Sequence, residues 1–197
     1  MLFGRWTRIP SSYNGRIDVH TAGERLEIFV DGYDQSTAYI RKMWQAALNR
    51  LPDNAKIEKV LVLGLGGGTV LGEIAQRFPA CSLTAVEHDP AMIAIFREHW
   101  PGDTPVEIIE GDALAAIQTI TATFDFLVVD LFTGQTTAPF LEDSATIERL
   151  AARLVPDGLC LLNAFKNEKL FPLFAEVMTP LNKWRYKYNA LGLYRKQ

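Results

Sequence analysis

The sequence predicts an α/β fold in which a mostly parallel, Rossmann-like, doubly wound sheet carries helices on both faces. The first observation is that short, unbroken apolar runs recur along the chain, as in strands that are buried on both faces. The second is that segments with helical spacing of apolar residues separate these runs. The third is a glycine cluster at residues 64–68, directly after the first apolar run, where such sheets turn into their first helix.

Composition restricts the class of protein. The chain has 197 residues, of which 48% are hydrophobic and 22% charged, which is typical of a globular protein with a core. No apolar stretch approaches the roughly 18 residues that a membrane span needs, and Arg5 and Arg8 are not followed by the apolar run of a secretory signal. We therefore expect a cytoplasmic protein without membrane association, in which Cys81 and Cys160 are buried thiols.

The charge balance also limits the partners. Twenty basic and 23 acidic residues give a net charge of -3, which argues against a general nucleic-acid-binding surface. Residues 164–197 are basic, and we interpret them as a solvated face, with a contact surface for an acidic partner as the alternative. The three histidines and two cysteines show no metal-ligand spacing, so no metal is expected.

The N-terminal segment predicts a small unit over residues 1–54, ahead of a main domain over residues 55–197. Alternation at 16–20 and 25–30, around a turn at 21–24, predicts a β-hairpin. Ser36 or Thr37 can cap a helix that runs to about Arg50.

The main domain alternates strands and helices. The strands are expected at 60–63, 83–86, 106–109, 126–129 and 159–162. The helices are expected near 69–78, 90–99, 113–119 and 143–154, with one more at 169–178. Residues 184–188 and 191–195, paired across Asn189-Ala190, predict a C-terminal antiparallel hairpin.

The glycine cluster is the first functional signal. Its glycines allow a tight turn and a close approach to a ligand, and the following helix offers unpaired N–H groups. The pattern departs from Gly-x-Gly-x-x-Gly at Thr69 and lacks the Gly-Lys-Ser/Thr of a phosphate loop. A tight strand–helix turn alone can also require such glycines.

Three acidic residues follow successive predicted strands, whose carboxyl ends meet at one edge of the sheet. Glu87 can accept hydrogen bonds from ribose hydroxyls, or it is a surface acid at a helix start. Asp112 can bind an adenine amino group or cap the next helix. Asp130 can hold an amine or act as a general base, or it caps the loop that follows. Together they predict a crevice that binds a nucleoside.

Six segments, in this order, resemble the spermidine synthase-like branch of the class I S-adenosylmethionine-dependent methyltransferase superfamily, over about residues 13–165. They are Asp31-Gly32 with Gln35, residues 60–69, residues 86–90, residues 111–113, residues 124–130 and residues 156–159. The resemblance implies Asp130 as the catalytic residue and a homodimer as the assembly. It implies S-adenosylmethionine, its decarboxylated form or methylthioadenosine as the ligand. The residues it assigns to that ligand are Gly64, Gly66, Gly67, Gly68, Thr69, Glu87, His88, Asp112, Ala113 and Gln35.

The departures from this family concern acidic residues. Thr69-Val70 stands where the family has Asp-Gly, and the run from Asp130 to Gly134 keeps only the first acid of Asp-Ser-Ser/Thr-Asp-Pro. Tyr39-Ile40-Arg41 replaces Tyr-His-Glu. The resemblance implies that the missing carboxylates hold a cationic aminopropyl group and a polyamine.

We therefore expect a transferase that moves a methyl group, rather than an aminopropyl group, to a small acceptor, for which an amine is one candidate. A non-catalytic nucleoside-binding or scaffold paralogue is the first alternative, and a genuine spermidine synthase is the second. A nicotinamide-dependent dehydrogenase is disfavoured because the glycine pattern fails at Thr69.

Overall fold

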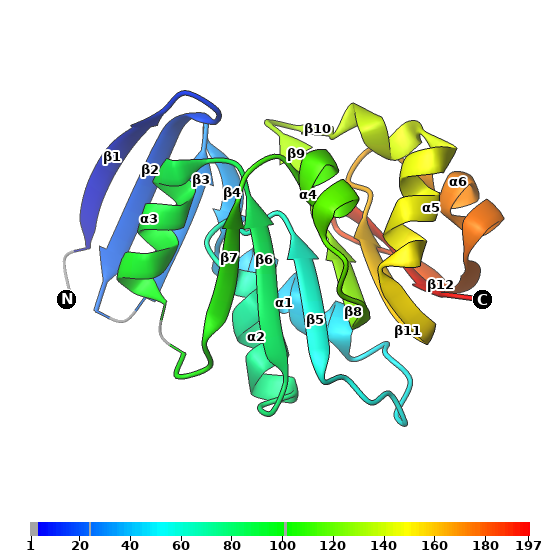
Figure 1. The fold of residues 1–197 in the computed structure, drawn as a ribbon. Helices are drawn as coiled ribbons and strands as arrows, with labels where there is room; N and C mark the ends of the chain where they lie inside the picture. The colour runs from blue at the N-terminus through cyan, green and yellow to red at the C-terminus, as the bar shows by residue number, and fades with distance from the viewer. Residues whose placement is uncertain (1–3, 24, 101) are drawn as a thin grey trace.

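A computed structural model describes residues 4–23, 25–100 and 102–197. A seven-stranded sheet, in the order β12-β13-β11-β8-β5-β6-β7, forms the centre of the molecule (Figure 1). Its strands are β5 (Lys59–Leu63), β6 (Ser82–Glu87), β7 (Val106–Glu110), β8 (Phe124–Val129), β11 (Leu154–Asn163), β12 (Thr179–Tyr186) and β13 (Asn189–Arg195). β11, β8, β5, β6 and β7 run parallel, while β13 pairs antiparallel with β11 and β12. The predicted doubly wound sheet with a C-terminal antiparallel hairpin is confirmed.

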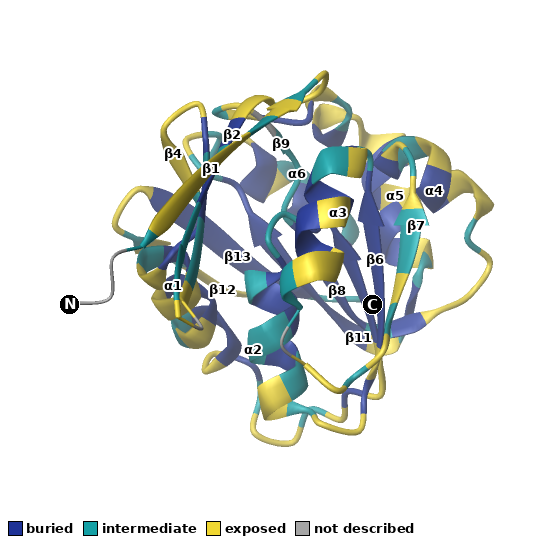
Figure 2. Cartoon of the chain, turned by 90° about the vertical axis from the view of Figure 1, so that its left-hand side faces the viewer, coloured by how far each residue is buried: buried dark blue, intermediate teal, exposed yellow. Residues whose placement is uncertain are grey.

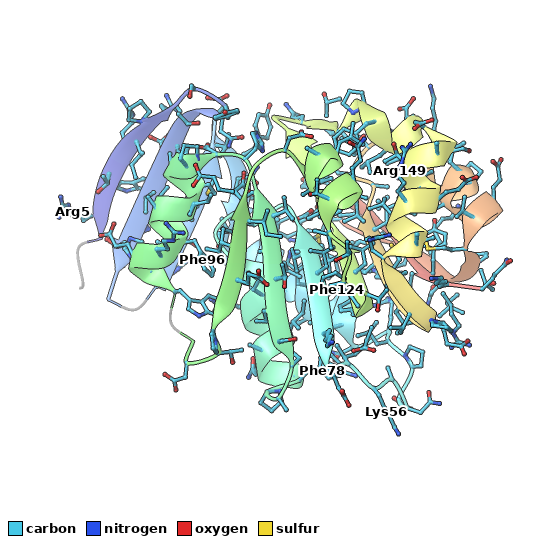
Figure 3. All side chains as sticks on the ribbon, viewed as in Figure 1. Arg5, Lys56, Phe78, Phe96, Phe124 and Arg149 are labelled. Atoms are coloured by element: carbon cyan, nitrogen blue, oxygen red, sulfur yellow. The ribbon has the colours of Figure 1, made fainter. Side chains whose placement is uncertain are left out.

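The apolar runs form strands because both faces of the sheet are covered. In β5, Val60 and Val62 pack toward one hydrophobic cluster, and Leu61 and Leu63 pack toward another. Phe96 is a member of the first cluster and Phe124 of the second, and both are labelled in Figure 3. This double burial explains why the strands read as continuous rather than alternating apolar sequence.

Three helices line each face. α1 (Ala38–Leu48), α2 (Thr69–Arg77) and α3 (Pro90–His99) contribute to the first cluster, and α4 (Ala113–Thr119), α5 (Ser144–Ala152) and α6 (Leu170–Val177) to the second. Side chains of Thr37, Asp89, Asp112 and Asp143 accept hydrogen bonds from the first turns of α1, α3, α4 and α5, as preferred N-cap residues do. Between β8 and α5 lie β9 (Phe132–Thr133), β10 (Thr136–Thr137) and the 3₁₀ helix η1 (Pro139–Glu142).

The N-terminal unit is a four-stranded antiparallel sheet beside α3. The predicted hairpin is β2 (Gly15–Ala22) with β3 (Arg25–Val30), and β1 (Arg5–Ser11) and β4 (Tyr33–Ser36) flank it; Glu24 of the predicted turn lies outside the described residues. One face of this sheet packs on Met92 and Ile95 of α3. β1 forms an edge and is exposed over most of its length (Figure 2). Two more strands thus extend the expected hairpin.

α1 joins the core of the central sheet. Met43 and Trp44 are 1% exposed and pack in the same cluster as α2 and β5. The division after residue 54 stays a prediction. In the described part of the chain, no helix has both the length and the apolar character needed to cross a membrane.

The C-terminal hairpin turns at a different place from the one predicted. We expected the chain to reverse across Asn189-Ala190, but Asn189 is the first residue of β13, and Lys187 and Tyr188 make the turn. Lys187 adopts the left-handed conformation there, with φ of 51°. Asn189 lies in the strand because its side chain is buried, with only 6% exposed, and hydrogen-bonded inside the protein. A turn signal in the sequence does not reveal such a buried polar contact.

Candidate functional site

The loop between β5 and α2 forms the floor of the candidate site. Gly64 has φ of 93° and Gly66 has φ of 50°, in the left-handed region that favours glycine. A Cβ atom on Gly64 would overlap the carbonyl oxygen of Asp130, so the loop after β8 lies directly against this turn. A Cβ atom on Gly66 would meet nothing within 4 Å. The glycines therefore allow the turn and also leave open space above it.

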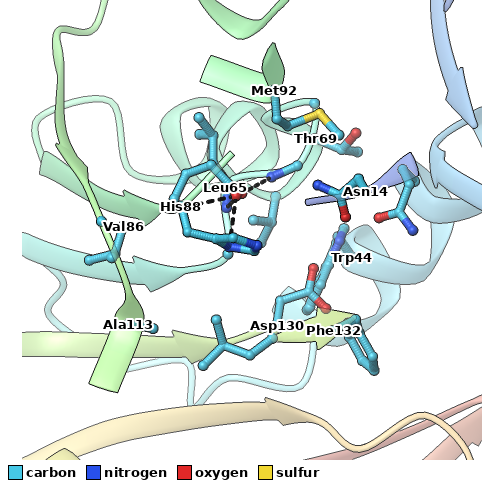
Figure 4. Close-up of a pocket in the computed structure, with 18 residues that line it drawn as sticks. Asn14, Trp44, Leu65, Thr69, Val86, His88, Met92, Ala113, Asp130 and Phe132 are labelled. Carbon is cyan, nitrogen blue, oxygen red and sulfur yellow. Dashed lines mark hydrogen bonds and ion pairs between the residues drawn. The ribbon is translucent and has the colours of Figure 1, made fainter. Parts of the chain in front are cut away.

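A cavity lies over this loop. Most of the residues that the resemblance assigns to the ligand line it, namely Gly64, Gly66, Gly67, Thr69, Glu87, His88, Ala113 and Gln35. Asp130 lines it as well, and Figure 4 shows its side chain reaching toward Trp44 beside Phe132. Gly68 is the N-cap of α2 and lies against Phe96 instead.

Glu87 ends β6 and is 7% exposed. One carboxylate oxygen accepts hydrogen bonds from the backbone N–H groups of Leu65 and Gly66, at 3.1 and 3.4 Å. The other accepts from the N–H groups of His88 and Asp89, both at 2.9 Å. These four donors match the four lone-pair sites of a carboxylate. Ribose hydroxyls can therefore bind Glu87 only by sharing or displacing these bonds, of which the bond from Gly66 is the longest.

The N-terminal unit contributes to the rim of the cavity. Ser11 at the end of β1 and Asn14 in the turn to β2 each donate a hydrogen bond to Asp89 at 2.6 Å. The ring of Tyr13 packs edge-on against the ring of His88, with 4.7 Å between the ring centres. Asn14 lines the cavity. We did not predict these contacts from the sequence, although Asn14-Gly15 is a hairpin-turn signal that marks this segment.

Asp112 is exposed and caps α4, because its carboxylate accepts a hydrogen bond from the backbone N–H of Ala115 at 2.9 Å. Its neighbours Gly111 and Ala113 line the cavity. Of the two roles that the sequence left open, the capping bond is the one that the described side chain makes. A role in base recognition stays a prediction.

Thr69 stands at the start of α2 with its hydroxyl bonded to Ser36 of β4. No acidic side chain lies in the first turn of α2. Gln35, the residue before Ser36, lines the same cavity. β4 therefore carries side chains to the glycine loop, and the N-terminal end of α2 carries no negative side chain.

Asp130 follows β8, and one of its oxygens accepts a hydrogen bond from Asn163 at 2.9 Å. Burial raises the pKa of Asp130 from 3.8 to about 6, while the bond from Asn163 lowers the pKa and the charge of Glu87 raises it by smaller amounts. A carboxyl group with such a pKa is ionised at neutral pH and remains a usable base. The catalytic role of Asp130 stays a prediction.

Asp130→Asn is expected to stabilise the fold more at neutral than at acidic pH. Because the pKa of Asp130 is raised in the folded chain to about 6, folded protein holds the proton where unfolded protein releases it. The free energy of unfolding therefore falls as Asp130 ionises. Urea unfolding should show that the advantage of the variant grows by about 2 kcal/mol between about pH 4.5 and about pH 7.5. An equal advantage at both pH values would contradict the raised pKa.

A second cavity adjoins the first at Asp130. The two cavities share Gln35, Trp44, Asp130 and Phe132. Further aromatic residues line the second cavity: Tyr33, Tyr39, Phe165 and Tyr188. A ligand in each cavity would meet the other beside Asp130.

Charged residues are few around the second cavity. In the described part of the chain they are Asp34, Asp130 and Lys166, and Lys166 donates a hydrogen bond to Gln135 at 2.6 Å. Their formal charges sum to one negative charge. Each buried ammonium group that lacks a partner costs several kcal/mol. The cavity therefore favours a ligand with at most one positive charge.

The chain is similar in sequence to known proteins. The family model described as a methyltransferase domain matches residues 60–158, about half of the chain. The polyamine aminopropyltransferase 2 of Aquifex aeolicus is 26% identical over 184 residues, which are 87% of this chain and 37% of that protein. The polyamine aminopropyltransferase of Vibrio vulnificus is 27% identical over 124 residues, covering 60% of this chain and 41% of that protein. The chain thus spans about two fifths of the length of these relatives.

Solved structures share the fold. A probable spermidine synthase from Corynebacterium glutamicum superimposes with a TM-score of 0.79 at 19% identity, over 96% of this chain and 79% of that one. The N-methyltransferase NodS from Bradyrhizobium japonicum, in complex with S-adenosyl-L-homocysteine, superimposes with a TM-score of 0.64 at 16% identity, over 81% and 88%. The chain belongs to the methyltransferase-domain family, and the relatives named above are polyamine aminopropyltransferases.

Proposed function

We propose that the chain transfers the methyl group of S-adenosylmethionine to a small acceptor that carries at most one ammonium group. The observation that carries this proposal is the meeting of two cavities at Asp130. The first cavity, over the glycine loop, would hold the donor. The second, with its aromatic walls and low charge, would hold the acceptor.

The first cavity suits a donor that keeps its α-carboxylate. The N-terminus of α2 presents backbone N–H groups and the positive end of the helix dipole, and it carries no acidic side chain. An anionic group is therefore favoured there over a bare ammonium group. Glu87 has a carboxylate at the right edge of the sheet for ribose hydroxyls. Bound S-adenosylmethionine would supply an electrophilic methyl group on a sulfonium centre.

The residues of this chain would act on the acceptor. Asp130, at the junction of the cavities, can accept a hydrogen bond from an attacking amine or hydroxyl and take its proton. Trp44 and Phe132 line both cavities and can restrict the acceptor to one approach. Holding two reactants in line is itself a large part of such catalysis.

A donor panel with Thr69→Asp tests the proposal. Calorimetry should show that the wild-type chain binds S-adenosylmethionine about tenfold more tightly than its decarboxylated form, a difference of about 1.4 kcal/mol. An aspartate at residue 69 should reverse the order, because it repels a carboxylate and attracts an ammonium group. Thr121→Asp adds the same charge at an exposed position that does not line the cavity, and should leave the order unchanged. A wild-type preference for the decarboxylated donor would contradict methyl transfer.

Aminopropyl transfer is the second candidate, favoured by the names of the relatives, which are polyamine aminopropyltransferases. The two reactions give products of different mass. Incubation with each donor and a panel of monoamines and polyamines, followed by mass spectrometry, distinguishes a methylated from an aminopropylated acceptor. Donor binding without product from any acceptor would favour the non-catalytic paralogue.

A further inference from the structure

We propose that Asn163 is a positioning residue for Asp130, at the end of a one-way hydrogen-bond chain that starts at Tyr39 and passes through Asn189. The catalytic role of Asp130 rests on the proposed function. The hydrogen-bond chain is a property of the protein itself. It therefore has a test that needs neither donor nor acceptor.

Three elements of the fold position the residues of the hydrogen-bond chain. Asn163 ends β11, is 4% exposed, and its amide Nδ2 donates to Oδ1 of Asp130 at 2.9 Å. Asn189 begins β13, and its Nδ2 donates to Oδ1 of Asn163 at 3.1 Å. The hydroxyl of Tyr39, on α1, donates to Oδ1 of Asn189 at 2.6 Å. All three side chains also border the second cavity.

A backbone group fixes the direction of these bonds. The N–H of Phe165 points at Oδ1 of Asn163 at 3.3 Å, and because an N–H can only donate, that atom must be the oxygen. The amide nitrogen of Asn163 then faces Asp130. Asn189 must in turn direct its own nitrogen to Asn163 and its oxygen to Tyr39. Every link therefore donates toward Asp130.

Tyr39 is the first donor of the hydrogen-bond chain. Its hydroxyl lies near two acceptors, Oδ1 of Asn189 and the carbonyl oxygen of Tyr186, the latter at 3.0 Å. Burial raises the pKa of Tyr39, so the hydroxyl keeps its proton. Because these protein acceptors engage that hydrogen, Tyr39 can offer only lone pairs to a ligand.

The hydrogen-bond chain has two consequences for Asp130. A donor fixed on Oδ1 favours the ionised carboxylate and holds its orientation. Within the described residues, Oδ2 of Asp130 accepts no hydrogen bond and is available to a ligand. Asp130 and Tyr39 together present acceptors only, so the ligand between them must contribute N–H or O–H groups.

Other charged groups face Asp130 and must stay constant in a test. Glu87 at the end of β6 raises the pKa of Asp130 through its charge. Asp34 on β4 and Lys166 after β11 border the same second cavity, and His88 borders the first. None of these residues is altered in the variants below.

The substitution Asn163→Asp tests the hydrogen-bond chain with almost no change in the shape of the side chain. Aspartate still accepts the bonds from Phe165 and Asn189, but it presents an oxygen, not a donor, to Asp130. The pair should therefore share a proton, and carboxyl-carbon NMR of the ligand-free protein should show the apparent pKa of Asp130 raised by about one unit or more. Asn167→Asp is the matched control: its amide bonds to Thr137 and Glu142, and the pKa of Asp130 should stay near the wild-type value.

Asn189→Asp provides a second test, should the first variant fold poorly by its amide NMR spectrum. It keeps the bond from Tyr39 but cannot donate to Asn163, so a smaller rise in the pKa of Asp130 is expected. An unchanged pKa in every variant that folds would overturn the proposal. Failure of the proposed function would appear separately. Calorimetry would then show no donor binding, while the NMR titration would still show the effect of the hydrogen-bond chain on the pKa of Asp130.

Discussion

Replacing Glu87 by glutamine is expected to reduce binding of S-adenosylmethionine by about 100-fold or more. Two ribose hydroxyls would share this charged acceptor with its backbone donors, and about 1.5 kcal/mol for each, the lower end for bonds to a charged group, accounts for that loss. Glutamine has one acceptor oxygen, whereas the carboxylate of Glu87 accepts from Leu65, Gly66, His88 and Asp89. Its amide nitrogen would face two backbone donors. We therefore also expect the free energy of unfolding to fall by about 2–4 kcal/mol.

Glu110→Gln is the matched control for this prediction. Glu110 pairs with Glu87 in register on the neighbouring strand β7, but it is exposed. Calorimetry with S-adenosylmethionine and urea unfolding of both variants should show an effect at residue 87 only. Wild-type affinity in Glu87→Gln would show that the ribose lies elsewhere.

Gly64→Ala is expected to destabilise the fold by about 3 kcal/mol or more. Gly64 has φ of 93°, and a Cβ atom would overlap the carbonyl oxygen of Asp130, so strain and a backbone clash add. Gly66→Ala should cost only about 1 kcal/mol, because φ is 50° and nothing lies within 4 Å of the new Cβ atom. The same open space belongs to the cavity, so Gly66→Ala should fold and bind S-adenosylmethionine more weakly.

Urea unfolding and calorimetry on the two glycine variants separate the two roles of the loop. A stable Gly64→Ala protein would mean that the loop after β8 can move away from β5. Unchanged affinity in Gly66→Ala would mean that the ligand does not approach this part of the loop. Either result would contradict the site as described.

The parallel strands could be predicted because their residues are buried on both faces. Val60 to Leu63 are all apolar for this reason, and the same holds for Phe126 to Val129. β1 could not be recognised in the same way. It is an edge strand with an exposed, polar sequence that contains Pro10, and such sequence has no periodicity to detect. β4 has only four residues, which is too short for a pattern.

The candidate site could be predicted in part. Glu87 ends one parallel strand and Asp130 follows another in the same sheet, and the order of such strands brings their ends together. The side-chain bonds of Asp112 depend on the local geometry at the start of α4, which the sequence left open between two roles. Asn163 and Asn189 come together only through the antiparallel pairing of β13 with β11. A pairing between distant strands carries no local signal in either strand.

Amide chemical-shift mapping during a titration with S-adenosylmethionine tests the central claim most directly. The claim is that one adenosyl donor binds over the glycine loop, next to Asp130. We predict saturable shifts at the backbone amides of Leu65, Gly66, His88 and Ala113, which surround the first cavity. Shifts that do not saturate, or that cluster on β12 and not around this loop, would contradict it.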